Sequence, residues 1–285
     1  MTVGAPACRL VARGRSLDLE RPALMGIVNA TPDSFSDGGR YESLGAQLDV
    51  AHELAAAGAS ILDLGGQSGI TGVPEIPVAE EIRRVVPLVE AVRDKIPESL
   101  ISVDTYRPAV VYAVLEAGAH IVNDISGLLY PDIADLCAAA GAGLVVMHTR
   151  ARPKEKVLDT ELYVDVTADV VAFLTATTDT ATRRGVARHA IVVDPGPDFA
   201  KTPHQTVAVL RQLDQIRALG WPVLLALSRK DFVGAITGRP PTGRVAGTLG
   251  AIAPFAALPG VIFRVHDVRA VADYLQAAAD LRSGP

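Results

Sequence analysis

Polar and charged side chains recur at one kind of position in this chain, directly after short apolar runs. They are Asn29, Asp104, Asn123, Asp124, His148, Asp194, Ser228, Arg229, Lys230, Arg264, His266 and Asp267. Singly, each has an ordinary structural interpretation, such as a helix N-cap, a turn or a buried histidine. Together they are harder to explain that way, because charge gathered in one place inside a protein is costly without a partner. We therefore interpret them as one candidate site.

The donors and acceptors of this set suit a flat heterocycle. Acceptor oxygens and an amine donor come from Asp104, Asn123, Asp194 and Lys230. A carboxylate pairs well with an N–H and an NH₂ on one ring edge, so a pterin or a guanine fits. Arg264 and His266 are donors that suit an anion such as a phosphate.

A long loop rich in Gly, Ser and Asp, NATPDSFSDGGR (29–40), follows the first apolar run. Such a loop can act as a lid over a site. Phe35 is its exposed aromatic candidate, and it suits a packing contact that holds the loop down equally well. No cluster supplies three metal ligands, which argues against a structural zinc. A Mg²⁺ ion held by Asn29 and a substrate phosphate is compatible with the sequence.

The composition argues against several classes of protein. The net charge of −5 and the lack of a long Lys/Arg run disfavour a nucleic-acid or anionic-membrane partner. Cys8 and Cys137 lack the spacing of a redox or metal pair, which favours a reducing, cytoplasmic compartment. The N-terminus has no signal-peptide core, and Pro and Gly interrupt the apolar runs. We therefore expect no membrane span.

Short strands and Ala-rich helices alternate along the chain and would bring these residues together. Strands are expected at 24–29, 60–66, 100–105, 120–125, 143–148, 190–196, 222–230 and 261–267, and helices at 44–58, 79–95 and 107–118, among others. Continuous apolar strands indicate a parallel sheet that is buried on both faces. Eight strand–helix units predict a (β/α)₈ barrel, with the site at the carboxyl ends of the strands. An open doubly wound sheet is the alternative.

No linker divides the chain, so residues 1–285 are predicted to form a single domain. Residues 8–20 are expected to form a β-hairpin about Gly14 that closes the bottom of the barrel.

Six segments, taken together, resemble the dihydropteroate synthase family of folate biosynthesis. They are MGIVNATPDSFSDGG (25–39), ISVDT (101–105), IVNDI (121–125), VDPGPDFAK (193–201), LSRK (227–230) and FRVHDV (263–268). The resemblance runs in order from Ser16 to about Leu281. It implies a (β/α)₈ barrel, usually a homodimer. It also implies the condensation of 6-hydroxymethyl-7,8-dihydropterin pyrophosphate with p-aminobenzoate, in which pyrophosphate leaves before the amine attacks.

The resemblance also assigns roles to individual residues. The pterin would be held by Asp104, Asn123, Asp194 and Lys230, with Met147 and Phe199 lining its pocket. The pyrophosphate would be held by Asn29, Arg264 and His266, with Mg²⁺ near Asn29. Lys230, Arg264 and His266 would be the catalytic residues, and Asp33, Ser34, Phe35 and Asp37 would belong to the lid.

Two positions depart from the family pattern. After the paired glycines the family has an arginine that contacts pyrophosphate, and here Ile70 takes its place. A charge-assisted hydrogen bond is worth roughly 1.5–3 kcal/mol, or about one to two powers of ten in rate. Asp231 follows the SRK segment, where the family often has Ser or Arg. An acid there would repel the carboxylate of p-aminobenzoate.

These departures leave three hypotheses. The first is a working synthase in which a cation of the loop 149–156 replaces the missing arginine, namely Arg150, Arg152, Lys154 or Lys156. A simply solvated basic loop is the alternative interpretation of that segment. The second is an inactive or weakly active paralogue that binds pterin, or an enzyme whose acceptor lacks a carboxylate. The third is a pterin-dependent methyltransferase, which the lid, SRK and RVHD segments disfavour.

Overall fold

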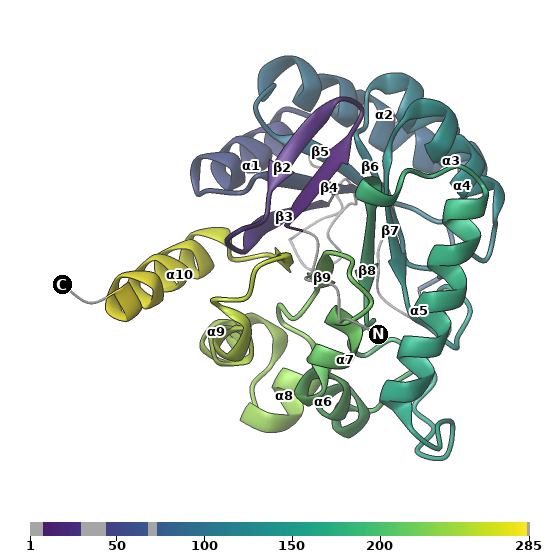
Figure 1. Ribbon diagram of the computed structural model, residues 1–285. Helices are drawn as coiled ribbons and strands as arrows, with labels where there is room; N and C mark the ends of the chain where they lie inside the picture. The colour runs from purple at the N-terminus through teal and green to yellow at the C-terminus, as the bar shows by residue number, and fades with distance from the viewer. Residues whose placement is uncertain (1–7, 30–43, 68–72, 284–285) are drawn as a thin grey trace.

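The structure, a computed structural model, describes residues 8–29, 44–67 and 73–283 (Figure 1). A closed barrel of eight parallel strands lies at its centre, in the order β10-β3-β4-β5-β6-β7-β8-β9. The strands are β3 (Ala23–Asn29), β4 (Ile61–Gly65), β5 (Leu100–Asp104), β6 (Ile121–Asp124), β7 (Gly143–Met147), β8 (Ile191–Asp194), β9 (Val223–Leu225) and β10 (Val261–Val265). The predicted (β/α)₈ barrel is confirmed, and the open sheet is wrong.

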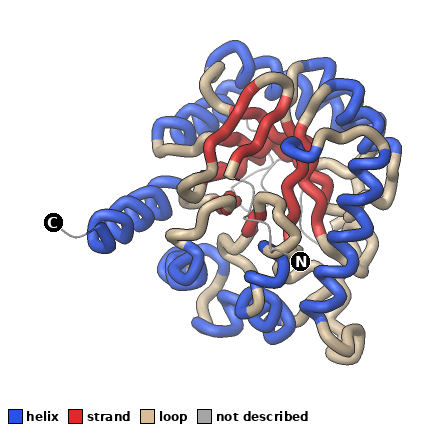
Figure 2. Tube along the Cα trace, in the orientation of Figure 1, coloured by secondary structure: helices blue, strands red, loops and turns tan. Residues whose placement is uncertain are grey.

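Helices surround the barrel, as Figure 2 shows in blue around the red strands. They are α1 (Leu44–Ala56), α2 (Val78–Lys95), α3 (Pro108–Ala117), α4 (Asp132–Ala140), α5 (Val166–Arg183), α6 (Pro203–Arg211), α7 (Leu213–Arg217), α8 (Asp231–Thr237), α9 (Val245–Ile252) and α10 (Val268–Ser283). Gly118 and Gly141 end α3 and α4 with φ of 116° and 62°. This left-handed C-cap conformation favours glycine, which explains the AG pairs before the strands.

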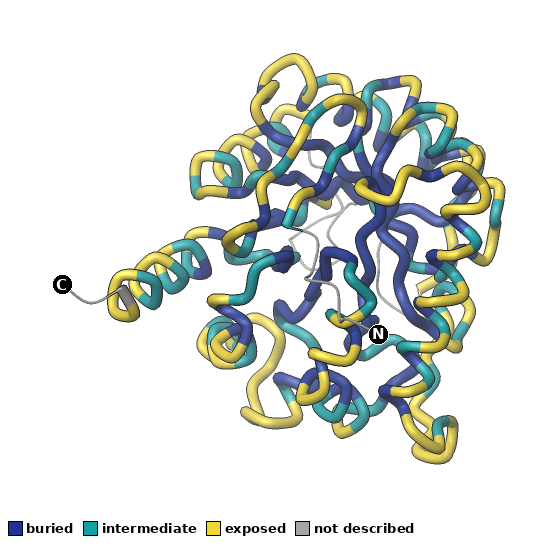
Figure 3. Tube along the Cα trace, in the orientation of Figure 1, coloured by how far each residue is buried: buried dark blue, intermediate teal, exposed yellow. Residues whose placement is uncertain are grey.

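The core has two parts because each strand is covered on both faces (Figure 3). Val, Leu and Ile side chains on the outer face of the strands pack against the surrounding helices. A second cluster fills the lower interior of the barrel and includes Met25, Ile61 and Ile262. These continuous apolar runs are what the two-sided burial of a parallel sheet requires.

The N-terminal hairpin consists of β1 (Arg9–Ala12) and β2 (Arg15–Asp18), paired antiparallel. Its Leu10 and Ala12 are buried in the lower interior cluster. The backbone N–H of Arg13 also donates to the carbonyl of Gly141 at 2.7 Å, just before β7 begins. The hairpin therefore closes the amino-terminal end of the barrel, as predicted.

One predicted strand is shorter than expected. β9 ends at Leu225 instead of continuing to Lys230. Arg229 adopts φ of 60°, a left-handed conformation that a strand cannot contain. The apolar residues after Leu225 are buried outside the ladder, so their hydrophobicity alone did not mark the strand end.

Several predicted positions lie outside the described residues, namely the lid residues Asp33, Ser34, Phe35 and Asp37 and the substituted position Ile70. Across the part of the chain that is described, no helix combines the length and apolar character needed to span a membrane.

Candidate active site at the carboxyl ends of the strands

Strand register brings the predicted polar residues to one end of the barrel. Asn29 pairs with Gly65, Gly65 with Asp104, and Asp104 with Asn123 across neighbouring strands. Further around the barrel, Asp194 ends β8 beside Met147, which is buried at the end of β7. In (β/α)₈ barrels this is the end at which active sites form.

A buried carboxylate, Asp63, connects several of these residues. Its Oδ2 lies 2.6 Å from Arg264 Nε, and it accepts from Asn123 Nδ2 at 3.1 Å. Its Oδ1 accepts from the Ser102 hydroxyl at 2.6 Å. Arg264 also donates from Nη2 to Asp104 at 2.8 Å. Arg264 is thus fixed between two carboxylates, and the negative charge of the mouth is partly neutralised.

Asp63 and Ser102 are not among the residues predicted from the sequence. Asp63 lies in the middle of the apolar segment ILDLG and is fully buried. A signal was present, because a charged residue inside a buried strand needs a partner. The partner, Arg264, is 201 residues away, so pattern alone did not reveal the pair.

Asn123 and Asp194 present acceptor oxygens in a nearly dry environment. Asn123 is 2% exposed, and its Oδ1 has no hydrogen-bond partner among the described residues. Asp194 is 3% exposed, and burial raises the pKa of its carboxyl to about 6 even though Gly196 N–H donates to it. Burial also raises the pKa of Asp104, with Asp63 adding to the effect and Arg264 opposing it. Acceptors held in this way are costly unless a ligand donates to them.

The ammonium of Lys230 lies 4.3 Å from the centre of the Phe199 ring. Burial lowers the pKa of Lys230, and Asp198 and Asp194 oppose that shift. Arg244 fixes the turn that carries Lys230 by donating to the carbonyls of Arg229 and Lys230 at 2.8 and 3.0 Å. Arg244 was not predicted, and its place in a loop 14 residues further along gave no signal.

His266 is held as a neutral donor. The Ser228 hydroxyl oxygen lies 3.0 Å from His266 Nδ1 and accepts from the His266 backbone N–H at 3.2 Å. The hydroxyl proton is therefore directed to Nδ1, which leaves Nε2–H as the donor of the ring. Burial, followed by Arg264, lowers the pKa of His266 to about 4. Arg229 pairs with Asp267 at 2.6 Å, and its charge also contributes to lowering the pKa of His266.

The side of the mouth next to β4 and β5 carries a second polar network. Tyr106 donates to Glu75 at 2.6 Å, and Arg107 pairs with both Glu75 and Glu81, at 2.5 and 3.1 Å. Gln67 donates to the Tyr106 hydroxyl at 3.3 Å, while its Oε1 is buried with no partner among the described residues. None of these residues was predicted as a site residue.

The cations of the loop after β7 have different surroundings. Arg150 pairs with Asp169 at 2.6 Å, and Lys156 pairs with Asp231 at 3.4 Å. Arg152 and Lys154, by contrast, line a pocket together with Asp104. Burial lowers the pKa of Lys154, and the nearby carboxylates of Asp104, Glu75 and Glu81 oppose the shift.

The second departure, Asp231, begins α8 and is mostly exposed. Arg244 Nη1 lies 3.3 Å from its carboxylate and Lys156 Nζ lies 3.4 Å from it. Its negative charge is therefore opposed by two cations, which weakens the repulsion expected toward an anionic acceptor.

Metal ligands are sparse at this end of the barrel. Among residues 8–29, 44–67 and 73–283, no group of three His, Cys, Asp or Glu side chains is placed to hold an ion. Asn29 is exposed at the end of β3 and offers one amide oxygen. That suits an ion that takes most of its ligands from a substrate phosphate and water.

The carboxyl ends of the strands in this closed barrel therefore gather buried acceptor oxygens, a lysine over an aromatic ring and the neighbouring donors Arg264 and His266. The sequence profile described as "Pterin binding enzyme" matches residues 25–266. The chain belongs to this family.

Its relatives include active and inactive members. It is 41% identical over 262 residues to the dihydropteroate synthase of Synechocystis, covering 91% of this chain and 90% of that protein. It is also 40% identical over 274 residues to the "Inactive dihydropteroate synthase 2" of Mycobacterium tuberculosis, covering 94% of this chain and 86% of that protein.

Solved structures agree with this assignment. The Xanthomonas albilineans dihydropteroate synthase with 4-aminobenzoic acid superposes with a TM-score of 0.88 and 39% identity, covering 98% of this chain and 100% of that one. The same enzyme in complex with 7,8-dihydropteroate superposes with a TM-score of 0.84 and is 38% identical. The match covers 97% of this chain and 100% of that one.

Proposed function

We propose that this protein is a dihydropteroate synthase-type transferase that condenses 6-hydroxymethyl-7,8-dihydropterin pyrophosphate with p-aminobenzoate. The observation that carries the proposal is the buried acceptor row, in which Asn123 Oδ1 lacks a partner among the described residues and Asp194 is 3% exposed. A pterin presents a ring N–H and an NH₂ side by side, which would satisfy both. About 40% identity to dihydropteroate synthases over most of the chain supports the same reaction.

In this proposal the pterin lies between the acceptor row and Phe199, with Lys230 donating to its ring carbonyl or nitrogen. Asp104 and Met147 would also line this pocket. The C–O bond between the pterin methylene and pyrophosphate breaks, and the amine nitrogen then forms the new C–N bond and loses a proton. Carboxylates beside the ring stabilise the cationic transition state electrostatically.

The pyrophosphate would lie at the corner formed by Asn29, Arg264 and His266. His266 contributes a neutral Nε2–H donor, because burial and Arg264 keep its pKa near 4. Arg264 is already paired with Asp63 and Asp104 and contributes its remaining N–H groups. Mg²⁺ is part of the proposal; it would bind Asn29 together with the diphosphate, whose charge it would offset.

For the missing loop arginine we propose Lys154 as the replacement cation. It lines a pocket with Asp104, as Arg152 does. Lys154 is chosen because the carboxylates of Asp104, Glu75 and Glu81 lie close enough to oppose the lowering of its pKa that burial causes. A primary amine on a flexible stem can reach a phosphate or a carboxylate from the neighbouring loop.

The assembly proposed is a homodimer of one-domain protomers in the cytoplasm. Strands from Ala23 to Val265 close one barrel, which supports a single domain over 1–285. An apolar groove between α6, α8 and α9 is lined by Leu210, Phe232, Val233, Ile236 and Phe255, and Ile236 is 69% exposed. An exposed apolar groove of this kind marks an interface. Only two cysteines in 285 residues are in keeping with a reducing compartment.

The test is to incubate the protein with dihydropterin pyrophosphate, Mg²⁺ and p-aminobenzoate, and to follow pyrophosphate and dihydropteroate. The proposal predicts that both products form and that both are lost in Lys230→Ala, which controls for contaminating enzyme.

A second candidate is the pterin-binding paralogue without synthase activity. Ile70 in place of arginine and 40% identity to an inactive relative favour it. Pterin binding by calorimetry with no dihydropteroate formed would select this candidate.

A further inference from the structure

The loop after β8 has an unfavourable backbone conformation. Asp198 and Ala200, two residues that are not glycine, have φ of 63° and 50°, and Gly196 has φ of 66°. A Cβ atom at Gly196 would lie 2.0 Å from the carbonyl oxygen of His148, so the loop packs directly on the end of β7. Residues other than glycine persist in this region only where surrounding contacts hold them.

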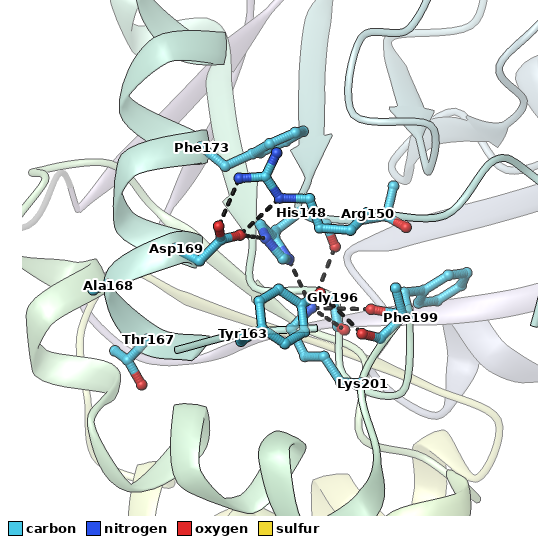
Figure 4. Close-up of polar contacts among 12 residues, drawn as sticks. His148, Arg150, Tyr163, Thr167, Ala168, Asp169, Phe173, Gly196, Phe199 and Lys201 are labelled. Carbon is cyan, nitrogen blue, oxygen red and sulfur yellow. Dashed lines mark hydrogen bonds and ion pairs between the residues drawn. The ribbon is translucent and has the colours of Figure 1, made fainter. Parts of the chain in front are cut away.

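Lys201 supplies such contacts from inside the protein (Figure 4). It is 1% exposed, and its ammonium donates to the carbonyls of Gly196 and Phe199 at 3.0 and 3.1 Å. The Tyr163 hydroxyl donates to the next carbonyl, that of Ala200, at 2.9 Å. The carbonyls of Gly196, Phe199 and Ala200 therefore accept from the side chains of Lys201 and Tyr163.

The third partner of the ammonium is His148 Nδ1, at 2.7 Å. His148 is fully buried, and its Nε2 lies 2.9 Å from Asp169 of α5, which Arg150 also binds (Figure 4). Burial, followed by Lys201, lowers the pKa of His148 to about 3, so the ring is neutral. Nδ1 then accepts from the ammonium and Nε2–H donates to Asp169.

The position of this loop determines the pocket wall. Phe199 lies under the ammonium of Lys230, and Asp198 accepts from the Phe232 backbone N–H at the start of α8. Asp194, the pterin acceptor, accepts from Gly196 N–H at 2.7 Å. Three parts of the proposed pterin site thus depend on where residues 195–200 lie.

We propose that Lys201 is a positioning residue for the pterin site: through the carbonyls of Gly196 and Phe199, and oriented by His148 and Asp169, it holds Phe199 against Lys230. The inference rests on the proposed pterin-binding function. It assigns to a buried lysine that touches no substrate a role in binding affinity and not only in fold stability.

The test compares Lys201→Met, which keeps the length and removes the donors, with Leu115→Ala, a cavity variant in α3 on another part of the barrel. Hydrogen exchange of peptides covering 195–200 is measured without ligand. The dissociation constant for 6-hydroxymethyl-7,8-dihydropterin is measured by calorimetry. We expect exchange and the dissociation constant to rise about tenfold or more in Lys201→Met, because the hydrogen bonds to the carbonyls of Gly196 and Phe199 are lost. Leu115→Ala should lower Tm by a comparable amount. It should change neither the exchange at 195–200 nor the dissociation constant by more than about twofold.

Unchanged exchange at 195–200 in Lys201→Met, or an equal rise in both variants, would overturn the inference. If Lys201→Met does not fold, His148→Gln removes the ring nitrogen that orients the ammonium and is subjected to the same criteria. Failure of the wild-type protein to bind the pterin would refute the proposed function instead, and the exchange measurement would still decide whether Lys201 holds the loop.

Discussion

Asp63 holds together the ion pairs at the mouth of the barrel. It is fully buried and accepts from Ser102, Asn123 and Arg264. Removal of one partner from a buried pair leaves the other charge without compensation, which costs more than the pair contributes. The residue is therefore a structural anchor for two proposed ligand-binding groups, Asn123 and Arg264.

We predict that Asp63→Asn lowers the free energy of unfolding by about 3 kcal/mol, measured by urea denaturation. The matched control is Asp231→Asn, because Asp231 is 60% exposed and pairs with Lys156 at 3.4 Å. Exposed pairs contribute about 0–1 kcal/mol. Equal losses in the two variants would contradict the role given to Asp63.

The residues at strand ends were predictable, and polar residues buried within a strand or a loop were not. Asp104, Asn123 and Asp194 each follow an apolar run, and parallel strands must bring their carboxyl ends together. Asp63 and Lys201 are recognisable only through partners far away in the sequence, Arg264 and His148. A single sequence carries no record of such pairings.

At the scale of elements, the loop between β7 and α5 decides which cation reaches the pocket. Asp169 and Asp231 draw Arg150 and Lys156 away from it. Lys154 adopts φ of 69° and lines the pocket beside Asp104.

We predict that Lys154→Ala lowers kcat/KM for dihydropteroate formation by about tenfold to a hundredfold, the value of one charge-assisted contact. Steady-state kinetics with both substrates varied would measure it. Lys156→Ala, in the same loop but paired with Asp231, should stay within about twofold, because Arg244 still opposes the charge of Asp231. A larger loss in Lys156→Ala than in Lys154→Ala would refute the assignment.

The predicted boundaries of the elements agree with the structure where a local residue preference determines them. The hairpin about Gly14 and the glycine ends of α3 and α4 are examples, because left-handed turns favour glycine. The predicted end of β9 was wrong, because residues 226–228 stay buried after the strand pairing ends, so the hydrophobic pattern continues beyond the strand.

At the scale of the whole molecule, the candidate site lies at one end of the barrel, and the hairpin covers the other end (Figure 1). The alternation of eight strands and helices favoured a closed barrel but left an open sheet as the alternative, because the same alternation occurs in both folds. The groove proposed as an interface was not predictable from periodicity, because it gathers residues from three separate helices, α6, α8 and α9.

We predict that the protein sediments as a dimer and that Ile236→Asp shifts it to a monomer, as a charge buried in an apolar interface would. Analytical ultracentrifugation at micromolar concentration measures the change. Leu281→Asp is the control, since Leu281 is 87% exposed near the end of α10 and is not among the residues that line the groove. A monomeric wild-type protein would contradict the proposed interface.

The most direct measurement is the calorimetric affinity for 6-hydroxymethyl-7,8-dihydropterin between pH 5 and 7, in the wild-type protein and in Asp194→Asn. Burial raises the pKa of Asp194 to about 6, and the ring N–H and NH₂ prefer the ionised carboxylate. Binding should therefore strengthen as the pH rises through 6 and weaken as it falls below 6. In Asp194→Asn the affinity should fall by about tenfold or more, the value of a charged hydrogen bond. Absence of pterin binding at every pH, or an unchanged affinity in Asp194→Asn, would contradict the account.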